Sequence, residues 1–172
     1  MTATAGRWRI TRTAAAWSST TRPARPSDLD ELALLRTTLW PEGSLDEHRR
    51  ELVEIFEGAW SRTYPYQVLV AEGDRHLIGF AEVTLRSRAD GCDPLRPAGY
   101  LEGWFVAESH RRRGIGAALL RAAEDWARAQ GCTEMASDTW LDNEVSQRAH
   151  EALGFEVVDR VVNFRKSLER RS

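Results

Sequence analysis

The run His110-Arg111-Arg112-Arg113-Gly114-Ile115-Gly116 contains the residue types that bind phosphate groups. It opens a predicted helix, where main-chain N–H groups attract anions and glycines let a ligand approach the backbone. The arginines add charged donors for a further phosphate. This spacing predicts a site for a pyrophosphate-containing cofactor, and a plain helix start with solvated arginines is the alternative interpretation.

Four carboxylates are candidates for binding an amine. Glu102 and Asp138 lie on two predicted strands that we expect to be adjacent, Glu82 lies on the neighbouring hairpin, and Asp142 precedes the last predicted helix. A carboxylate can bind an ammonium group and accept its proton, directly or through water. A single surface carboxylate is ordinarily solvated or ion-paired, but Glu102 and Asp138 at the ends of adjacent strands favour a shared role on the acceptor amine.

Neither a metal site nor an enzyme nucleophile is predicted. Cys92 and Cys132 match no Cys-x-x-Cys or Cys/His ligand spacing, so they indicate neither a zinc site nor a disulfide framework. They also lie outside any apparent arrangement with an activating base. Both cysteines are interpreted as ordinary thiols.

Hydrophobic periodicity and turn residues place these candidates on a mixed α/β fold. The predicted order is strand, helix, helix, three strands, helix, strand, helix and strand, with a surface loop over residues 87–98. The elements that can be located are helices at about Ser27–Leu39, Ser44–Gly58, Gly116–Gln130 and Asn143–Leu153, and strands at Gln67–Ala71, His76–Leu85, Gly99–Val106, Thr133–Ser137 and Phe155–Phe164.

Capping residues mark several of these helix ends. Ser27 and Asp28 offer an N-cap for the first helix, and Ser44 with Glu47 three residues later matches a capping box for the second. Gly131 follows the third helix as a C-terminal glycine.

Composition indicates a single globular domain over residues 18–172. The chain has 42% apolar and 29% charged residues, and it contains no apolar stretch long enough to span a bilayer. Residues 1–17 are interpreted as a flexible, arginine-rich arm; a transit peptide is the alternative, and a cytoplasmic location is preferred. The whole chain carries a formal net charge of −2, so once the five arginines of the first 27 residues are set aside the remainder carries −7, which favours cationic ligands over nucleic acid.

Two blocks of residues resemble the GNAT superfamily of N-acetyltransferases. Arg111, Gly114 and Gly116 occupy the positions of its R/Q-x-x-G-x-G/A signature. A second block at the expected distance resembles its N-x-x-A-x-x-x-Y-x-x-x-G-F pattern through Asn143, Ser146, His150, Gly154 and Phe155. The resemblance implies a central mixed sheet in which two parallel strands splay apart and bind acetyl-CoA, flanked by helices.

The same resemblance implies roles for individual residues. A main-chain N–H near Phe105 or Val106 would polarise the thioester carbonyl. The acceptor amine would attack the thioester directly, without a covalent enzyme intermediate. His150 stands where the superfamily usually has the tyrosine proposed to protonate the leaving thiolate; it is either that acid or, the preferred interpretation, a packing residue. The residues expected to bind the cofactor are Phe105, Val106, Arg111, Arg112, Arg113, Gly114, Ile115, Gly116, Ala117, Asn143 and Ser146.

Further segments look like the aminoglycoside 6'-N-acetyltransferases. This resemblance implies that Glu102 and Asp138 lie in the acceptor pocket, that Trp40 forms part of its wall, and that the protein is a homodimer that confers antibiotic resistance. Arg88 and Asp90 stand near the position where family members supply an aromatic contact. The segments that carry the resemblance are Leu39-Trp40, Leu101-Glu102-Gly103, His110-Arg111-Arg112, Cys132-Thr133-Glu134, Ala136-Ser137-Asp138, Leu141-Asp142-Asn143 and Leu153-Gly154-Phe155.

Three alternatives remain at this point. The acceptor could be another small polyamine or a protein amine, because the two blocks of residues that resemble the GNAT superfamily indicate only how CoA is bound. The chain could be a non-enzymatic acyl-CoA sensor, which would not need the Glu102 and Asp138 pair. Nucleic-acid binding through the basic arm is opposed by the acidic remainder of the chain.

Overall fold

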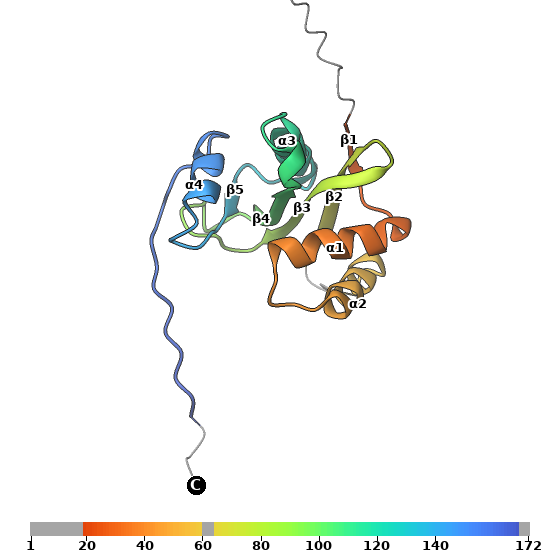
Figure 1. The fold of residues 1–172 in the computed structure, drawn as a ribbon. Coiled ribbons are helices and arrows are strands. Elements are labelled where there is room, and N and C mark those ends of the chain that lie inside the picture. Colours follow the sequence, from red (N-terminus) through yellow and green to blue (C-terminus); the bar gives the residue numbers. More distant parts are fainter. Residues whose placement is uncertain (1–18, 60–63, 169–172) are drawn as a thin grey trace, which may run out of the picture.

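The computed structural model describes residues 19–59 and 64–168, which build a five-stranded mixed sheet with helices on both faces (Figure 1). Neighbouring strands follow one another in chain order, antiparallel from β1 to β4, and β5 pairs parallel to β4. The strands are β1 (Thr20–Pro23), β2 (Tyr66–Gly73), β3 (His76–Arg86), β4 (Ala98–Val106) and β5 (Met135–Ser137).

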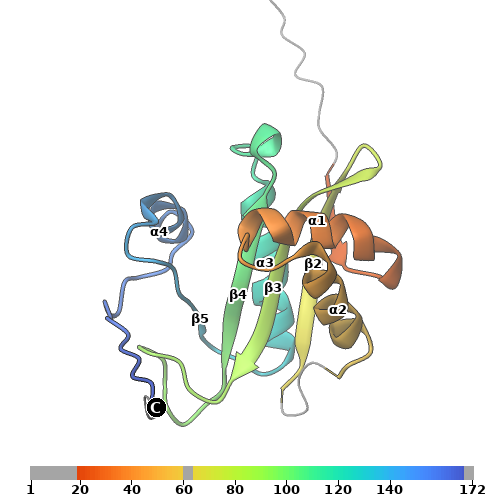
Figure 2. The ribbon, with the colours of Figure 1, turned by 60° about the horizontal axis from the view of Figure 1, so that its bottom comes forward.

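Helices α1 (Leu29–Leu39) and α2 (Leu45–Phe56) cover one face of the sheet, and α3 (Ile115–Ala129) covers the other (Figure 1). Helix α4 (Glu144–Glu151) lies beyond β5 at the sheet edge, as Figure 2 also shows. Short 3-10 turns precede α1 at Pro26–Asp28 and follow β4 at Glu108–His110.

Two apolar clusters hold these layers together, because alternate side chains of a strand point to opposite faces. On the α3 side, Leu69, Ala71 and Val83 pack with Leu119 and Leu120. On the α1 and α2 side, the cluster comprises Leu32, Ala33, Leu52, Val68, Val70, Leu77, Phe80 and Phe105. The strand pattern therefore sends one set of residues to each helical layer.

The helix ends agree with the predicted caps in two cases and differ in one. Ser44 and Glu47 form the capping box of α2, and Gly131 follows α3 with φ +87°. Asp28 makes no side-chain cap for α1; its carboxylate instead accepts from the main-chain N–H of Arg25 at 2.7 Å and from the guanidinium of Arg22 at 2.7 and 3.0 Å. The charged partner supplied by β1 outcompetes the local cap.

The predicted last strand, Phe155–Phe164, is wrong. From Phe155 to Ser167 the chain has no regular structure, and it leads away from the sheet in Figures 1 and 2. A strand needs a neighbouring strand to pair with, and the described sheet of β1 to β5 pairs none of its strands with this segment. Its apolar side chains, including Val161, Val162 and Phe164, are therefore exposed.

The predicted arm over residues 1–17 lies outside the described residues. Within the described part of the chain, no helix has the length and apolar character needed to cross a membrane.

Candidate active site

The parallel strands β4 and β5 separate shortly after they meet. Their pairing covers Gly99 to Leu101 against Met135 to Ser137, and β4 then continues to Val106 without β5 beside it. The hydroxyl of Ser137 donates to the carbonyl oxygen of Leu101 at 3.1 Å, at the point where the strands part. On the β5 side, residues 102–105 consequently have no strand partner, and this break in strand pairing is called the opening between β4 and β5 below.

Helix α3 begins beside this opening. Its N-cap, Gly114, has φ +79°, and no heavy atom lies within 4 Å of where a Cβ would be. A left-handed backbone conformation disfavours other residues there, and the open space leaves the helix N-terminus accessible to an anion. Ile115 is buried in the core and anchors this helix end.

Close contacts join the first turn of α3 to the end of β4. A Cβ on Gly116 would lie 2.8 Å from the indole of Trp104, whose Nε1 donates to the carbonyl oxygen of Gly116 at 3.1 Å. Arg111 donates from Nε to the carbonyl oxygen of Val106 at 3.0 Å. The glycine thus permits a strand–helix approach, and Arg111 links the anion-binding run to the strand.

His150 is held on both sides of its ring. Nδ1 lies 2.8 Å from the carbonyl oxygen of Ser146, and Nε2 lies 3.1 Å from the hydroxyl of Ser137. The ring also contacts Trp104 and Phe155 edge-on, with centroids 5.5 and 5.1 Å apart. These contacts favour the packing interpretation, since His150 joins α4 to the point where β4 and β5 separate.

Asn143 and Ser146 organise the start of α4. The side-chain oxygen of Asn143 accepts from the main-chain N–H of Ser146 at 3.1 Å, which makes Asn143 the N-cap. An N-cap of this kind satisfies one of the unpaired donors of a helix start.

On the α1 and α2 side of the sheet, a β-bulge directs a carboxylate into a pocket. Glu82 of β3 pairs with Gly103, while Val83 pairs with Leu101, so Glu102 is the extra residue on β4. A bulge bends a strand and re-aims its side chains. Trp40, at the end of α1, packs its indole against Gly103, where any Cβ would collide with the ring.

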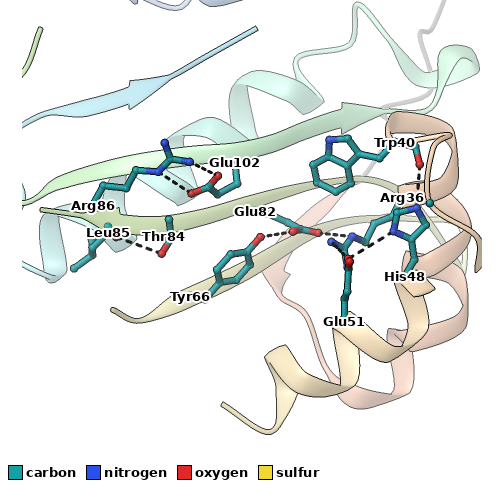
Figure 3. Close-up of a pocket in the computed structure, with 11 residues that line it drawn as sticks. Arg36, Trp40, His48, Glu51, Tyr66, Glu82, Thr84, Leu85, Arg86 and Glu102 are labelled. Atoms are coloured by element: carbon teal, nitrogen blue, oxygen red, sulfur yellow. Dashed lines mark hydrogen bonds and ion pairs between the residues drawn. The ribbon is translucent and has the colours of Figure 1, made fainter. Parts of the chain in front are cut away.

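This pocket has a volume of about 650 Å³ and is lined mainly by polar side chains (Figure 3). Its lining residues are Arg36, Trp40, Gly43, His48, Glu51, Tyr66, Glu82, Thr84, Leu85, Arg86 and Glu102. Figure 3 shows the Arg86–Glu102 pair at one end and Arg36 with Glu51 at the other.

Glu82 is the most deeply buried carboxylate of the pocket, with 0% of its surface exposed. The hydroxyl of Tyr66 donates to its Oε2, and Nε of Arg36 lies 3.1 Å from its Oε1. Burial raises the pKa of Glu82, while the charge of Arg36 and the Tyr66 hydrogen bond act in the opposite direction. Arg36 is itself buried and donates to Glu51 at 2.9 Å, so it is held between two carboxylates.

Asp138 is connected to the pocket through Tyr100. The Tyr100 hydroxyl donates to Oδ1 of Asp138 at 2.6 Å, and burial together with this carboxylate raises the pKa of the phenol. Cζ of Arg86 lies 3.2 Å from the centre of the Tyr100 ring, and its guanidinium donates to Glu102 at 3.2 and 2.7 Å. Asp138 and Glu102 are therefore joined, through Tyr100 and Arg86, in one chain of side-chain contacts.

The structure brings together most of the acceptor candidates. Trp40, Glu82 and Glu102 line one pocket, and Asp138 adjoins it through Tyr100. Asp142 is exposed in the loop before α4 and is not among the lining residues. The role of each of these residues stays a prediction.

Sequence reasoning missed several residues of this group. Glu82 and Thr84 alternate along one predicted strand and Arg86 follows it at the same spacing, as Tyr100 and Glu102 alternate along the next, so a polar period of two was the available signal. Arg36 and Tyr66 gave no such signal, because they come from a helix and a strand far apart in the sequence. The missed residues include Arg36, His48, Glu51, Tyr66, Arg86 and Tyr100.

The opening between β4 and β5 fits a CoA thioester. An accessible helix N-terminus with three consecutive arginines suits the phosphates, and the unpaired side of residues 102–106 suits an amide-containing arm. Within the described part of the chain, no group of three or more metal-ligating side chains occurs. The sheet is mixed, its two parallel strands separate, and an anion site lies at the start of α3. A pocket with carboxylates lies on the α1 and α2 side of the same sheet. Together these features define an acyl-CoA-dependent transferase.

Comparison with known proteins identifies the family to which the chain belongs. Residues 29–155 match the acetyltransferase (GNAT) family, and the chain belongs to that family. The resemblance inferred from the two sequence blocks and the fold it implied are thereby confirmed.

Relatives and solved structures share the same family. The chain is 45% identical to an aminoglycoside N(6')-acetyltransferase type 1 of Klebsiella aerogenes, covering 86% of this chain and 95% of that protein. It is 43% identical to the protein of the same name from Serratia marcescens, covering 82% and 94%. Among solved structures, AAC(6')-Iy in complex with the bisubstrate analogue CoA-S-monomethyl-acetylneamine superposes with a TM-score of 0.78 at 36% identity, covering 87% of this chain and 99% of that one.

Proposed function

We propose that this protein is an acetyl-CoA-dependent N-acetyltransferase that modifies the 6'-amino group of aminoglycoside antibiotics and so confers resistance to them. The relatives that share 45% and 43% identity over most of the chain carry this activity in their names. The observation that supports the acceptor class most directly is the pocket itself, where Glu51, Glu82 and Glu102 line one cavity. Aminoglycosides are polycations, and a cavity lined by carboxylates raises their local concentration.

In this proposal Glu102 and Asp138 bind the acceptor ammonium and accept its proton, directly or through water. Trp40 provides a flat apolar wall for a sugar ring. Glu82 lies at the base of the pocket and orients Tyr66 and Arg36. Asp142, exposed in the loop ahead of α4 and outside the lining of the pocket, is proposed as a further contact for the acceptor.

The cofactor side of the reaction uses the opening between β4 and β5. Acetyl-CoA supplies the acetyl group: the amine nitrogen forms the new C–N bond, the thioester C–S bond breaks, and the departing sulfur takes up a proton. In this proposal a main-chain N–H near Phe105 or Val106 polarises the carbonyl oxygen. The run from Arg111 to Ala117 binds the phosphates, and Asn143 and Ser146 contact the cofactor from the start of α4.

Acetyl transfer across a panel of amines tests this function. We expect acetylation of kanamycin and tobramycin, and no acetylation at the 6' position of an aminoglycoside that carries a hydroxyl group there. Spermidine and a lysine peptide serve as competing acceptor classes. A kcat/KM for either of them above that for kanamycin contradicts the proposal.

We further propose that the protein is a cytoplasmic homodimer. The segment Val157–Leu168 exposes a row of apolar side chains, and the outer edge of β5 pairs with no strand among the described residues. An unpaired edge and an exposed apolar strand-like segment favour association with a second copy.

A further inference from the structure

Arg86 occupies the position in the pocket where a cationic acceptor has to bind. Its guanidinium makes two hydrogen bonds to Glu102, at 3.2 Å from Nε and 2.7 Å from Nη2. It also covers the ring of Tyr100, whose hydroxyl is bonded to Asp138. One cation of the chain thus pairs directly with Glu102 and is linked to Asp138 through Tyr100.

The two arginines of the pocket differ in how firmly they are held. The Arg36 side chain is 5% exposed and lies between two carboxylates, Glu51 and Glu82, at 2.9 and 3.1 Å. The Arg86 side chain is 42% exposed and its carboxylate partner 24% exposed. A partly solvated pair of this kind exchanges partners at small cost, whereas a buried charge cannot leave its partners without a large penalty.

We propose that Arg86 is an internal counterion that pairs with Glu102 when the pocket lacks an acceptor, and that the acceptor ammonium replaces it. This inference rests on the proposed function, because it takes a polycationic acceptor as the ligand. The Arg86 side chain lies at the end of β3, where the strand gives way to the exposed loop from Ser87, so its guanidinium has solvent to move into. Arg86 is then a residue that sets acceptor affinity without touching the reacting atoms.

This arrangement makes a prediction opposite to that of a structural or substrate-holding role. Replacement of the guanidinium removes a competitor for Glu102, so acceptor binding becomes tighter rather than weaker. If the Arg86–Glu102 pair is favoured severalfold over the separated side chains, a ligand that must break it binds more weakly by the same factor. We therefore expect kanamycin to bind Arg86→Gln about three- to tenfold more tightly than the wild type.

Calorimetric titration of kanamycin A into the protein saturated with CoA tests the proposal. Arg86→Gln is compared with Arg86→Met, which retains the apolar stem that covers Tyr100. Both are expected to lower the Kd, while turnover at saturating acceptor stays within about twofold of the wild type. Arg49→Gln is the matched control, because Arg49 pairs with Asp30 on the protein surface outside the pocket; it removes the same charge and should leave the Kd within about twofold.

A double-mutant cycle with Glu102→Gln separates the counterion role from a general charge effect. In that background the Arg86 substitutions should no longer tighten binding. The role of Arg86 is contradicted by unchanged or weaker kanamycin affinity, by tightening that persists with Glu102→Gln, or by loss of the folded state in both Arg86 variants. A wild-type protein that binds no kanamycin contradicts the proposed function instead, so the two failures are distinguishable.

Discussion

At the scale of single residues, the carboxylates proposed to bind the acceptor are distinguished by their partners. Glu102 accepts from the guanidinium of Arg86, and Asp138 accepts from the hydroxyl of Tyr100. Both carboxylates therefore already accept hydrogen bonds from the chain's own donors. Glu82 differs, because it is fully buried and this burial raises its pKa, while the Arg36 charge and the Tyr66 hydrogen bond act in the opposite direction.

Asp138→Asn is expected to lower kcat/KM for kanamycin by on the order of 30- to 1000-fold, which corresponds to about 2 to 4 kcal/mol of transition-state stabilisation. The amide retains the size of the side chain and an oxygen for Tyr100, but it loses the charge and the ability to take a proton. Glu102→Gln should have a comparable effect. Steady-state kinetics check both variants, and the affinity for acetyl-CoA should be unchanged. A near wild-type kcat/KM in both variants would show that the acceptor binds elsewhere.

His150→Phe is expected to retain turnover within about tenfold of the wild type, because both ring nitrogens are already bonded to Ser146 and Ser137. The loss of those hydrogen bonds should instead reduce the free energy of unfolding by about 1 to 2 kcal/mol. Denaturant unfolding and kinetics on the same sample separate the two effects. A loss of several hundredfold in kcat with intact CoA binding would make His150 the acid.

At the scale of elements, the cofactor site depends on how one helix starts and how one strand ends. Helix α3 begins at a glycine in the left-handed region, and its first turn is tied to β4 through Trp104 and Arg111. Pairing between β4 and β5 stops at Leu101, and α4 reaches that point through His150. The opening is thus bordered by three elements whose mutual contacts are specific side-chain interactions.

Gly114→Val is expected to abolish acetyl-CoA binding, because a branched side chain disfavours φ +79° and occupies the approach to the helix N-terminus. Gly58→Val is a matched control: Gly58 has φ +70°, no heavy atom within 4 Å of a Cβ, and a position at the end of α2. Each variant should be destabilised by at least about 1 kcal/mol. Calorimetry with acetyl-CoA distinguishes them, and equal affinities in the two folded variants would remove the phosphate-loop assignment.

At the scale of the whole molecule, the C-terminal segment after Phe155 forms no helix or strand in the described chain and leaves apolar side chains exposed. Its apolar residues Val161, Val162 and Phe164 are exposed by 57, 70 and 94%. Exposure on this scale of neighbouring apolar side chains is costly in water, and a second copy with an open β5 edge offers a partner.

The double substitution Val162→Lys with Phe164→Lys is expected to convert a dimer into a monomer, because two charges would have to be buried at the interface. Sedimentation equilibrium should show the mass halved at the same protein concentration. Leu95→Lys is the control, since Leu95 is equally exposed at 91% but lies in the loop between β3 and β4. A wild-type protein that sediments as a monomer contradicts the proposed homodimer.

Local chemistry is what the sequence by itself determined. Capping residues, apolar periodicity and the glycine–arginine run depend on neighbours within a few positions, so α2, α3 and the β2–β3 hairpin were predicted correctly. The cofactor run and each block of the family resemblance belong to the same category, because the residues within one block lie close together in the chain. The strand predicted at Phe155–Phe164 failed because its pairing depends on a partner that no local pattern specifies.

Only the tertiary structure decided how the acceptor pocket is built. Arg36, Tyr66, Arg86 and Tyr100 come from four different elements, and their contacts with Glu82, Glu102 and Asp138 arise from strand register and the bulge at Glu102. A shift of one residue in register would send each strand side chain to the opposite face. Ion pairing across the sheet is therefore a property of the packed fold, which is why Arg86 beside Glu102 could not be read from the chain alone.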